Sequence, residues 1–315
     1  MSIIQHCQSI ERWQTAAQSD DNYTRSLEKG QVLFFPQLAF DDHFSADLLT
    51  PEILSEKAKN VSYDPNTGSI KGCAHRSEDI KTMMADYAKS SAMLVESLFP
   101  HYRGKLTPGK TSYRPVQTKG RKSSYRKDDS LLHIDSFPSM PVHGKRILRV
   151  FSNINPHGET RDWRVGASLD DAFDHCLENV KPPIPFTRKL MDWLGLTKSY
   201  RSEYDHYMLH LHHAMKRDPH FQVNTPQQHV NFPPRSSWLV FTDQVPHAAM
   251  RGQYLMEQTF YLDVEDMLQP ETSPLYRLRK RLQAMKKIRN SREWKLAGFV
   301  FLTALPSSIL LMMAE

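Results

Sequence analysis

The sequence predicts an α+β protein in which antiparallel strands fold into a jelly roll. Helical periodicity appears within the first hundred residues and again near 199–217, whereas short segments rich in β-branched and aromatic residues fill the centre. With 315 residues and 39% hydrophobic positions, the chain is long enough to bury the core of one large domain. Helices followed by many strands from one stretch of chain are typical of an antiparallel sheet that closes or folds into a sandwich.

The first hundred residues predict a buried strand and then a long helix. VLFFPQLAF (32–40) is a continuous apolar and aromatic run, which is typical of a buried strand. Residues 77–99 follow with helical spacing of their apolar positions. Ser77, with Asp79 and Ile80 shortly after it, gives this helix a start signal.

Strand-like segments dominate the centre of the chain and are separated by Gly, Pro and Ser. They are TSYRPVQ (111–117), LLHIDSF (131–137), RILRVFSNI (146–154), WLVFT (238–242) and MEQTFYLDV (256–264). Residues 199–217 have helical periodicity instead and predict a helix inserted between the strands. The apolar face of this helix carries Tyr204, Met208, Leu211 and Met215.

The cysteines and the N-terminus favour a reducing cytoplasm. Cys7, Cys73 and Cys176 are far apart, odd in number and form no C-x-x-C pair, so they suggest neither a disulfide framework nor a structural zinc site. The first residues, MSIIQHCQSIERWQ, lack the basic start, apolar run and cleavage site of a secretory signal.

Positive charge is concentrated in the last forty residues. The net charge is +6, yet residues 276–315 alone carry nine Lys or Arg against two Glu, so the rest of the chain is close to neutral. A near-neutral body with a basic tail favours a local electrostatic contact over a surface that tracks the phosphates of a nucleic acid. We therefore expect no nucleic-acid partner.

The tail also contains an apolar run that predicts membrane association. Residues 296–314 are 19 positions without a charge, which span roughly 28 Å as a helix against a hydrocarbon core of roughly 30 Å. The preceding Lys and Arg favour the cytoplasmic, anionic leaflet of a membrane. Pro306, Ser307 and Ser308 interrupt the run, so a spanning helix, an interfacial helix and a helix packed on the core remain alternatives.

His133-Ile134-Asp135 is an H-x-D motif on a segment of alternating character. Because strand side chains point to alternate faces, His133 and Asp135 are expected on the same face, where both can bind one ion. An H-x-D alone is common by chance, and a surface turn is its alternative interpretation.

His247 is the predicted third metal ligand. It lies in FTDQVPHAAM (241–250), where an apolar strand leads into it and Pro246 fixes the turn before it. Two His and one carboxylate on one face of a metal leave the other positions open, which suits non-haem Fe(II) oxygenases. The strand context and the 112 residues between Asp135 and His247 agree with a double-stranded β-helix, the cupin-like jelly roll.

A second histidine cluster lies on the inserted helix. His206, His210 and His213 have i, i+4, i+7 spacing, with His212 beside them, and such a set can bind zinc. No carboxylate-rich partner segment follows, so a solvated helix face is the competing interpretation.

Longer runs around the motif resemble one family. SYRP with Arg114, LLHIDSFPSMPVHGKRILRVFSNINPHGETRDWRVG (131–166) and WLVFTDQVPHAAMRGQYLMEQTFYL (238–262) closely resemble the bacterial Kdo hydroxylases. These are Fe(II)- and 2-oxoglutarate-dependent oxygenases that act on Kdo, the acidic eight-carbon sugar of the lipopolysaccharide inner core. The resemblance is strongest across residues 111–265.

The resemblance implies a reaction and a substrate. Fe(II), 2-oxoglutarate and O2 would together hydroxylate C3 of Kdo, with succinate and CO2 as co-products. The substrate would be Kdo-bearing lipid A or its precursor, which fits a tail that seeks a membrane surface. The implied domains are a jelly-roll oxygenase over 1–275, with N-terminal helices and the inserted helix, and a membrane-associating tail over 276–315.

Arginines are the candidates for binding the two acids, because a guanidinium bonds a carboxylate through two parallel hydrogen bonds. Many relatives of this enzyme class place the 2-oxoglutarate arginine on the strand after the distal His, where this chain has Gln258. The candidates for the 2-oxoglutarate site are therefore Arg251, Arg149 and Gln258 itself. The candidates for the Kdo carboxylate and the sugar face are Arg114, Arg149, Arg161 and Trp163.

Two other functions remain open from the sequence. One is the same iron chemistry on another acidic substrate, such as an acyl-CoA or a protein side chain. The other is a non-catalytic jelly roll tethered by its tail as an adaptor, which would show neither iron affinity nor oxoglutarate turnover.

Overall fold

The computed structural model describes residues 2–7, 13, 21–40, 44–120, 123–183 and 200–303, with side chains described as far as 288. The described helices are α1 (Asp21–Glu28), α2 (Ser77–Leu98), α3 (Leu169–Cys176), α5 (Glu203–Arg217), α6 (Pro219–Asn224) and α7 (Pro274–Thr303). The described strands are β1 (Ile4–His6), β2 (Val32–Phe35), β3 (Val61–Asp64), β4 (Ser69–Lys71), β5 (Thr107–Arg114), β6 (Arg146–Asn153), β7 (Arg161–Gly166), β8 (Gln227–Phe232), β9 (Ser237–Phe241), β10 (His247–Arg251) and β11 (Leu255–Leu262).

These strands form two sheets. The larger sheet has eight strands in the order β1-β2-β9-β6-β11-β5-β3-β4, and the smaller sheet has three in the order β10-β7-β8. Every pairing is antiparallel except that of β1 with β2. The predicted α+β class is therefore confirmed.

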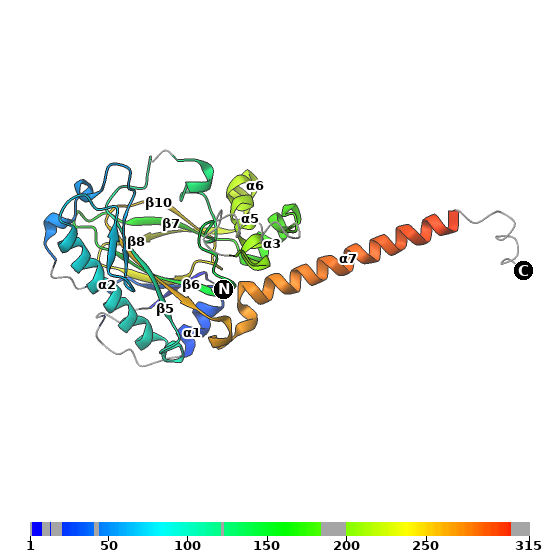
Figure 1. Cartoon of the computed structure of the whole chain (residues 1–315), viewed down its shortest axis with the longest axis horizontal. Coiled ribbons are helices and arrows are strands. Elements are labelled where there is room, and N and C mark those ends of the chain that lie inside the picture. The colour runs from blue at the N-terminus through cyan, green and yellow to red at the C-terminus, as the bar shows by residue number, and fades with distance from the viewer. Residues whose placement is uncertain are drawn as a thin grey trace, which may run out of the picture.

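Alternation along the central strands builds a separate core on each face of the large sheet. On β6, Leu148 and Val150 face a core shared with α2, whereas Phe151 faces a core shared with the small sheet. The second core places Trp163 of β7 and Phe232 of β8 against β9 and β6. The layers are thus α2, the large sheet and the small sheet (Figure 1).

A third core lies under the helices α3, α5 and α6. Met208, Leu211 and Met215 of α5 pack there with Leu132 and Ile134, the apolar neighbours of the H-x-D motif. The predicted inserted helix is confirmed as α5, which begins at Glu203 behind a capping box made by Ser202 and Asp205. This helical layer therefore holds the motif from the side opposite to the sheets.

Most of the predicted elements are confirmed with shifted ends. The predicted helix over 77–99 is α2, and four of the predicted strands are β5, β6, β9 and β11. The predicted strand over 32–40 stops at Phe35, because Pro36 follows and lacks an N–H for the ladder. The prediction of a strand over 131–137 was wrong, since only a single bridge, His133 with His247, forms there.

Helix α7 leaves the body after its first turns (Figure 1). Leu278 is buried against the α3–α5 core, and Arg277 and Arg281 form ion pairs with Asp170 of α3. Among the described residues no helix is long and apolar enough to cross a membrane. The predicted apolar run over 296–314 lies outside the described residues from position 304 onward.

A buried ion pair closes the end of the large sheet and supports a prediction about stability. Arg146 Nε lies 2.7 Å from Asp243 Oδ2, and neither side chain is exposed by more than 1%. Burial raises the pKa of Asp243, although Arg146 opposes the effect. Arg146→Leu is therefore expected to lower the free energy of unfolding by about 3–5 kcal/mol in urea titrations, because it leaves a buried carboxylate without its partner.

The control for this prediction is an exposed arginine with two carboxylate partners. Arg76 pairs with Asp47 and Asp79 at the surface, so Arg76→Leu is expected to cost less than about 1 kcal/mol. Equal losses in the two variants would contradict a special role for the buried pair.

Candidate metal centre

The H-x-D segment is joined to the start of β10 by backbone hydrogen bonds. His133 N–H donates to His247 O over 3.0 Å, and His247 N–H donates to His133 O over 2.8 Å. This reciprocal pair makes His133 and His247 direct cross-strand neighbours, so their side chains lie on the same face beside each other. Asp135 N–H donates to Thr242 O over 2.7 Å, which fixes the third residue of the cluster.

Both imidazoles are oriented by backbone carbonyls. His133 Nδ1 lies 2.7 Å from Leu131 O, and His247 Nδ1 lies 2.9 Å from Val245 O. A carbonyl only accepts, so each Nδ1 carries the proton and each Nε2 keeps its lone pair. The two rings are therefore held in the tautomer that a metal requires.

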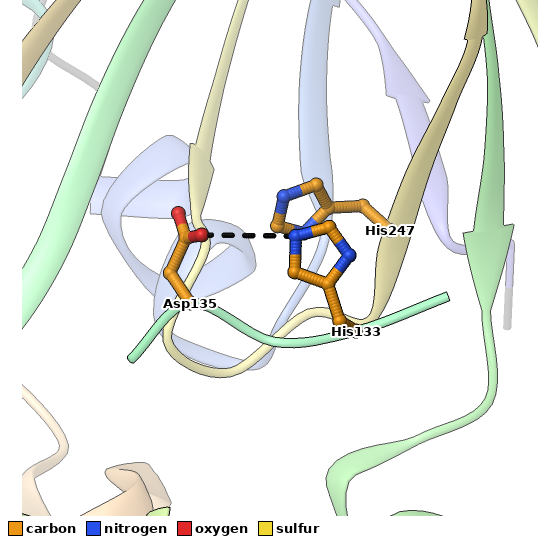
Figure 2. A group of neighbouring side chains, drawn as sticks. All are labelled: His133, Asp135 and His247. Atoms are coloured by element: carbon orange, nitrogen blue, oxygen red, sulfur yellow. Dashed lines mark ion pairs between the residues drawn. The ribbon is translucent and has the colours of Figure 1, made fainter. Parts of the chain in front are cut away.

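His133, Asp135 and His247 point toward one another (Figure 2). One ligand atom from each lies within 4.8 Å of the others, and His133 Nε2 is 3.9 Å from Asp135 Oδ1. In the part of the chain that the structure describes, this is the one group of three such residues that could hold a metal ion. Two imidazole nitrogens and one carboxylate oxygen are a donor set that suits Fe(II).

The electrostatics of the cluster favour its ligand forms. Burial lowers the pKa of His133 well below its usual value and also lowers the pKa of His247. Burial alone would raise the pKa of Asp135, but its pKa is lowered, and the charge of the neighbouring Arg149 is the largest effect in that direction. The two imidazoles are therefore neutral and the carboxylate is ionised. In these protonation states the three side chains can bind a metal without first releasing protons.

A cavity of about 190 Å³ opens onto the triad between the two sheets. Arg149 Nε lies 3.2 Å from Asp135 Oδ2, and Arg149 Nη1 lies 2.7 Å from Glu257 Oε1. Glu257 also binds Arg114, whose Nη2 lies 3.1 Å from Glu257 Oε2. The wall is completed by Asp129, Phe137, Phe151, Arg161, Trp163, Ala249 and Leu255.

Arg161 and Trp163 line this cavity from β7. Arg161 Nη1 donates to Thr118 Oγ1 over 2.7 Å and to Gly252 O over 2.8 Å. The Trp163 ring stacks on His247, with ring centroids 5.1 Å apart and an angle of 23° between the planes. Its Nε1 is buried without a hydrogen-bond partner among the described residues.

Comparison with known proteins identifies the family. The model of the 3-deoxy-D-manno-oct-2-ulosonic acid (Kdo) hydroxylase family matches residues 11–285. The chain belongs to the Kdo hydroxylase family. The predicted resemblance is thereby confirmed, while a comparison with curated protein sequences finds no match.

Solved structures of a Kdo hydroxylase are similar to this chain. The apo form of KdoO, described as a non-haem Fe(II) α-ketoglutarate-dependent dioxygenase, is 44% identical, with a TM-score of 0.84 over 89% of this chain and 96% of that one. KdoO in complex with cobalt(II) is 44% identical, with a TM-score of 0.85 over 90% and 96%. KdoO in complex with α-ketoglutarate and Fe(III) is 43% identical, with a TM-score of 0.84 over 89% and 96%.

In this member of the Kdo hydroxylase family, two of the predicted oxoglutarate residues lie away from the cavity. The register of β10 against β7 shifts between Ala249 and Arg251, and Arg251 pairs instead with Asp162 on a half-exposed surface. Gln258 points to the opposite face of β11, where it binds Thr111 Oγ1 at 2.5 Å. Arg149 is the one of the three candidates that lines the cavity.

Sequence reasoning missed Glu257 and Asp129 in the cavity wall. Glu257 carries the negative charge between Arg149 and Arg114, and its side chain is only 5% exposed. The alternation of MEQTFYLDV contained the signal, because it places Glu257 and Gln258 on opposite faces of one strand. Asp129 precedes the motif in a segment without strand character and had no comparable signal.

The histidines of α5 do not form a metal cluster within the described residues. His206 Nε2 contacts Lys181 O, and His210 is exposed. His212 faces inward, where its Nδ1 lies 2.6 Å from Ile134 O. The centroids of the His206 and His210 rings lie 4.4 Å apart, but no third ligand joins them in the described part of the chain, so the zinc alternative lacks a complete ligand set there.

Proposed function

We propose that the protein is an Fe(II)- and 2-oxoglutarate-dependent dioxygenase that hydroxylates Kdo. The observation that carries the proposal is the His133, Asp135 and His247 cluster, which faces a cavity lined by arginines in a member of the Kdo hydroxylase family. Those three side chains would hold Fe(II). The two facing sheets around the cavity support a double-stranded β-helix as the scaffold.

When bound, Fe(II) supplies the O2 chemistry that couples decarboxylation of 2-oxoglutarate to hydroxylation of a C–H bond. The protein contributes binding, orientation and exclusion of water. Arg149 is proposed to take the distal carboxylate of 2-oxoglutarate, because it lines the cavity next to Asp135 and offers a planar pair of donors. Phe137 and Phe151 line the same wall and limit the access of water.

The remaining cations suit an acidic sugar. Arg114 and Arg161 line the cavity and are proposed to bind the Kdo carboxylate, which places C3 near the metal for hydroxylation. Because the Trp163 ring is stacked on His247, we propose that Trp163 orients this ligand. That the ring also packs on the sugar face stays a prediction.

The decisive experiment supplies all reactants to the purified protein. Fe(II), 2-oxoglutarate, O2 and a Kdo-bearing lipid A precursor are incubated with it, and the lipid is analysed by mass spectrometry. The proposal expects one added oxygen per lipid together with succinate. Succinate with unchanged lipid would point to another acidic substrate, whereas no succinate under any condition would point to the non-catalytic adaptor.

The proposed site of action is the cytoplasmic face of the inner membrane, where Kdo-bearing lipid A precursors are presented. Exposed basic side chains on α7 support a contact with anionic lipid. They are Arg279, Lys280, Lys286 and Lys287, and Ile288 is 55% exposed beside them. We further propose that the oxygenase domain spans 1–275 and that residues 276–315 form the membrane-associating tail.

Removal of residues 296–315 tests this contact. The shortened protein is expected in the soluble fraction, whereas the full-length chain sediments with vesicles that contain anionic lipid, because the apolar run supplies most of the affinity for the bilayer. Co-sedimentation of purified protein measures the difference. Equal binding of both forms would contradict a role for this segment.

A further inference from the structure

The ligand-bearing segment 131–135 is paired with a strand along only one of its edges. The backbone groups of His133 and Asp135 face β10 and the residues before it, where they form the hydrogen bonds described above. The backbone groups of Leu132 and Ile134 point to the opposite edge, where no strand of the described chain pairs with them. An unpaired edge this deeply buried would cost free energy, since both residues are 0% exposed.

Gln222 of α6 takes the place of the missing strand. Its Oε1 accepts from Leu132 N–H over 2.7 Å, and its Nε2 donates to Leu132 O over 2.9 Å, so one amide satisfies both backbone groups. The second Nε2 hydrogen donates to Met215 O over 2.9 Å, and Oε1 also accepts from Arg164 Nη2 over 3.3 Å. All four hydrogen-bonding positions of the amide are therefore used.

His212 of α5 binds the same edge. Its Nδ1 donates to Ile134 O over 2.6 Å, between the two metal-ligand residues of the motif. Its ring meets the His133 ring edge-on, with centroids 5.1 Å apart. His212 is 8% exposed and Gln222 is 7% exposed, so water does not replace either contact readily.

We propose that Gln222 and His212 are positioning residues for the metal centre. They fix the outer edge of segment 131–135, so that His133 and Asp135 remain aligned with His247. The inference rests on the proposed metal site and assigns to the inserted helices a role in it. Groups that orient metal ligands affect affinity by about 10- to 100-fold when removed, which sets the expected size of the effect.

Cobalt(II) titration of the purified full-length chain tests the inference. Gln222→Leu and His212→Phe remove the hydrogen bonds and keep side chains of similar size, and each is expected to raise the Kd for Co(II) by about 10- to 100-fold. His212→Asn keeps a donor near the position of Nδ1 and is expected to stay within about threefold of the wild type. Quenching of tryptophan fluorescence reports binding, since Trp163 stacks on His247.

Phe221→Leu separates positioning from general loss of stability. Phe221 neighbours Gln222 on α6 and is fully buried in the same core, but its side chain makes no polar contact with the motif. This variant is expected to lower Tm while leaving the Kd for Co(II) close to that of the wild type. Where Gln222→Leu does not fold, the His212→Phe and His212→Asn pair decides the question.

Three outcomes would overturn the inference. The first is that folded Gln222→Leu and His212→Phe proteins bind Co(II) with a Kd within threefold of the wild type. The second is that Phe221→Leu loses as much Co(II) affinity as those two variants. The third is that His212→Asn loses as much Co(II) affinity as His212→Phe. A wild-type protein that binds no Co(II) would contradict the proposed metal centre itself, and the flat titrations of all proteins would identify that case.

Discussion

Replacing His133 with alanine is expected to abolish succinate formation, with a loss of more than about 100-fold. Residues that only support a metal ligand change affinity or activity by up to about 100-fold when they are removed. His133 is proposed to bind the metal directly, so its loss is expected to cost more. Its Nε2 is directed at the cluster by the bond between Nδ1 and Leu131 O. Turnover is measured as succinate released, and bound iron is measured by elemental analysis of the same sample.

His210→Ala is the matched control for this variant. His210 is an exposed histidine of α5 that takes no part in the cluster, so iron content and turnover are expected to match the wild type. Near-normal turnover of His133→Ala, or full iron content in that variant, would contradict its assignment as a ligand. A similar loss in His210→Ala would instead point to a second metal position on the helix.

The triad could be predicted because period-two alternation does not require a complete strand. Segment 131–135 is extended and alternates as a strand does, although it forms only one bridge. His133 and Asp135 therefore share a face, as the motif predicts. His247 could be predicted from the strand before it, since β9 leads directly to the turn that contains Pro246.

The strands of the small sheet could not be predicted in the same way. β7 is RDWRVG, where the charged Arg161 occupies a buried position, and β8 is QQHVNF, where only Val230 and Phe232 are buried, so neither strand carries the apolar run or the β-branched content that predicts a strand. Arg161 is 4% exposed and is satisfied by Thr118 and Gly252 from distant segments. Such partners are fixed by tertiary structure, which local periodicity does not contain.

Which of the candidate arginines lines the cavity depends on strand phase, and the sequence did not determine that phase. Arg251 follows His247 by four residues, but the register shift after Ala249 turns it toward Asp162. Arg149 lies on β6 beside β11, where it reaches both Asp135 and Glu257. A register shift of one residue moves a side chain to the other face of its strand, so such a shift in β6 would turn Arg149 away from the cavity.

Arg149→Leu is therefore expected to raise the KM for 2-oxoglutarate by on the order of 10- to 100-fold. A hydrogen bond to a charged group contributes about 1.5–3 kcal/mol, and each 1.4 kcal/mol is a factor of ten. Initial rates of succinate formation at saturating Fe(II) measure this constant. Arg251→Leu is the matched control, because Arg251 is also an arginine paired with an aspartate, yet it lies outside the cavity.

Arg149 contacts Asp135 as well as Glu257, so its removal acts on the metal ligand too. The two effects are separable, because a weaker metal site raises the Fe(II) concentration needed for half-maximal rate, whereas a lost carboxylate partner raises KM for 2-oxoglutarate even with Fe(II) in excess. A rise in KM that disappears at saturating Fe(II) would assign Arg149 to support of Asp135 alone. A rise in the KM for 2-oxoglutarate in Arg251→Leu but not in Arg149→Leu would indicate that Arg251 binds the cosubstrate. The end of β10 would then have to rearrange when 2-oxoglutarate binds.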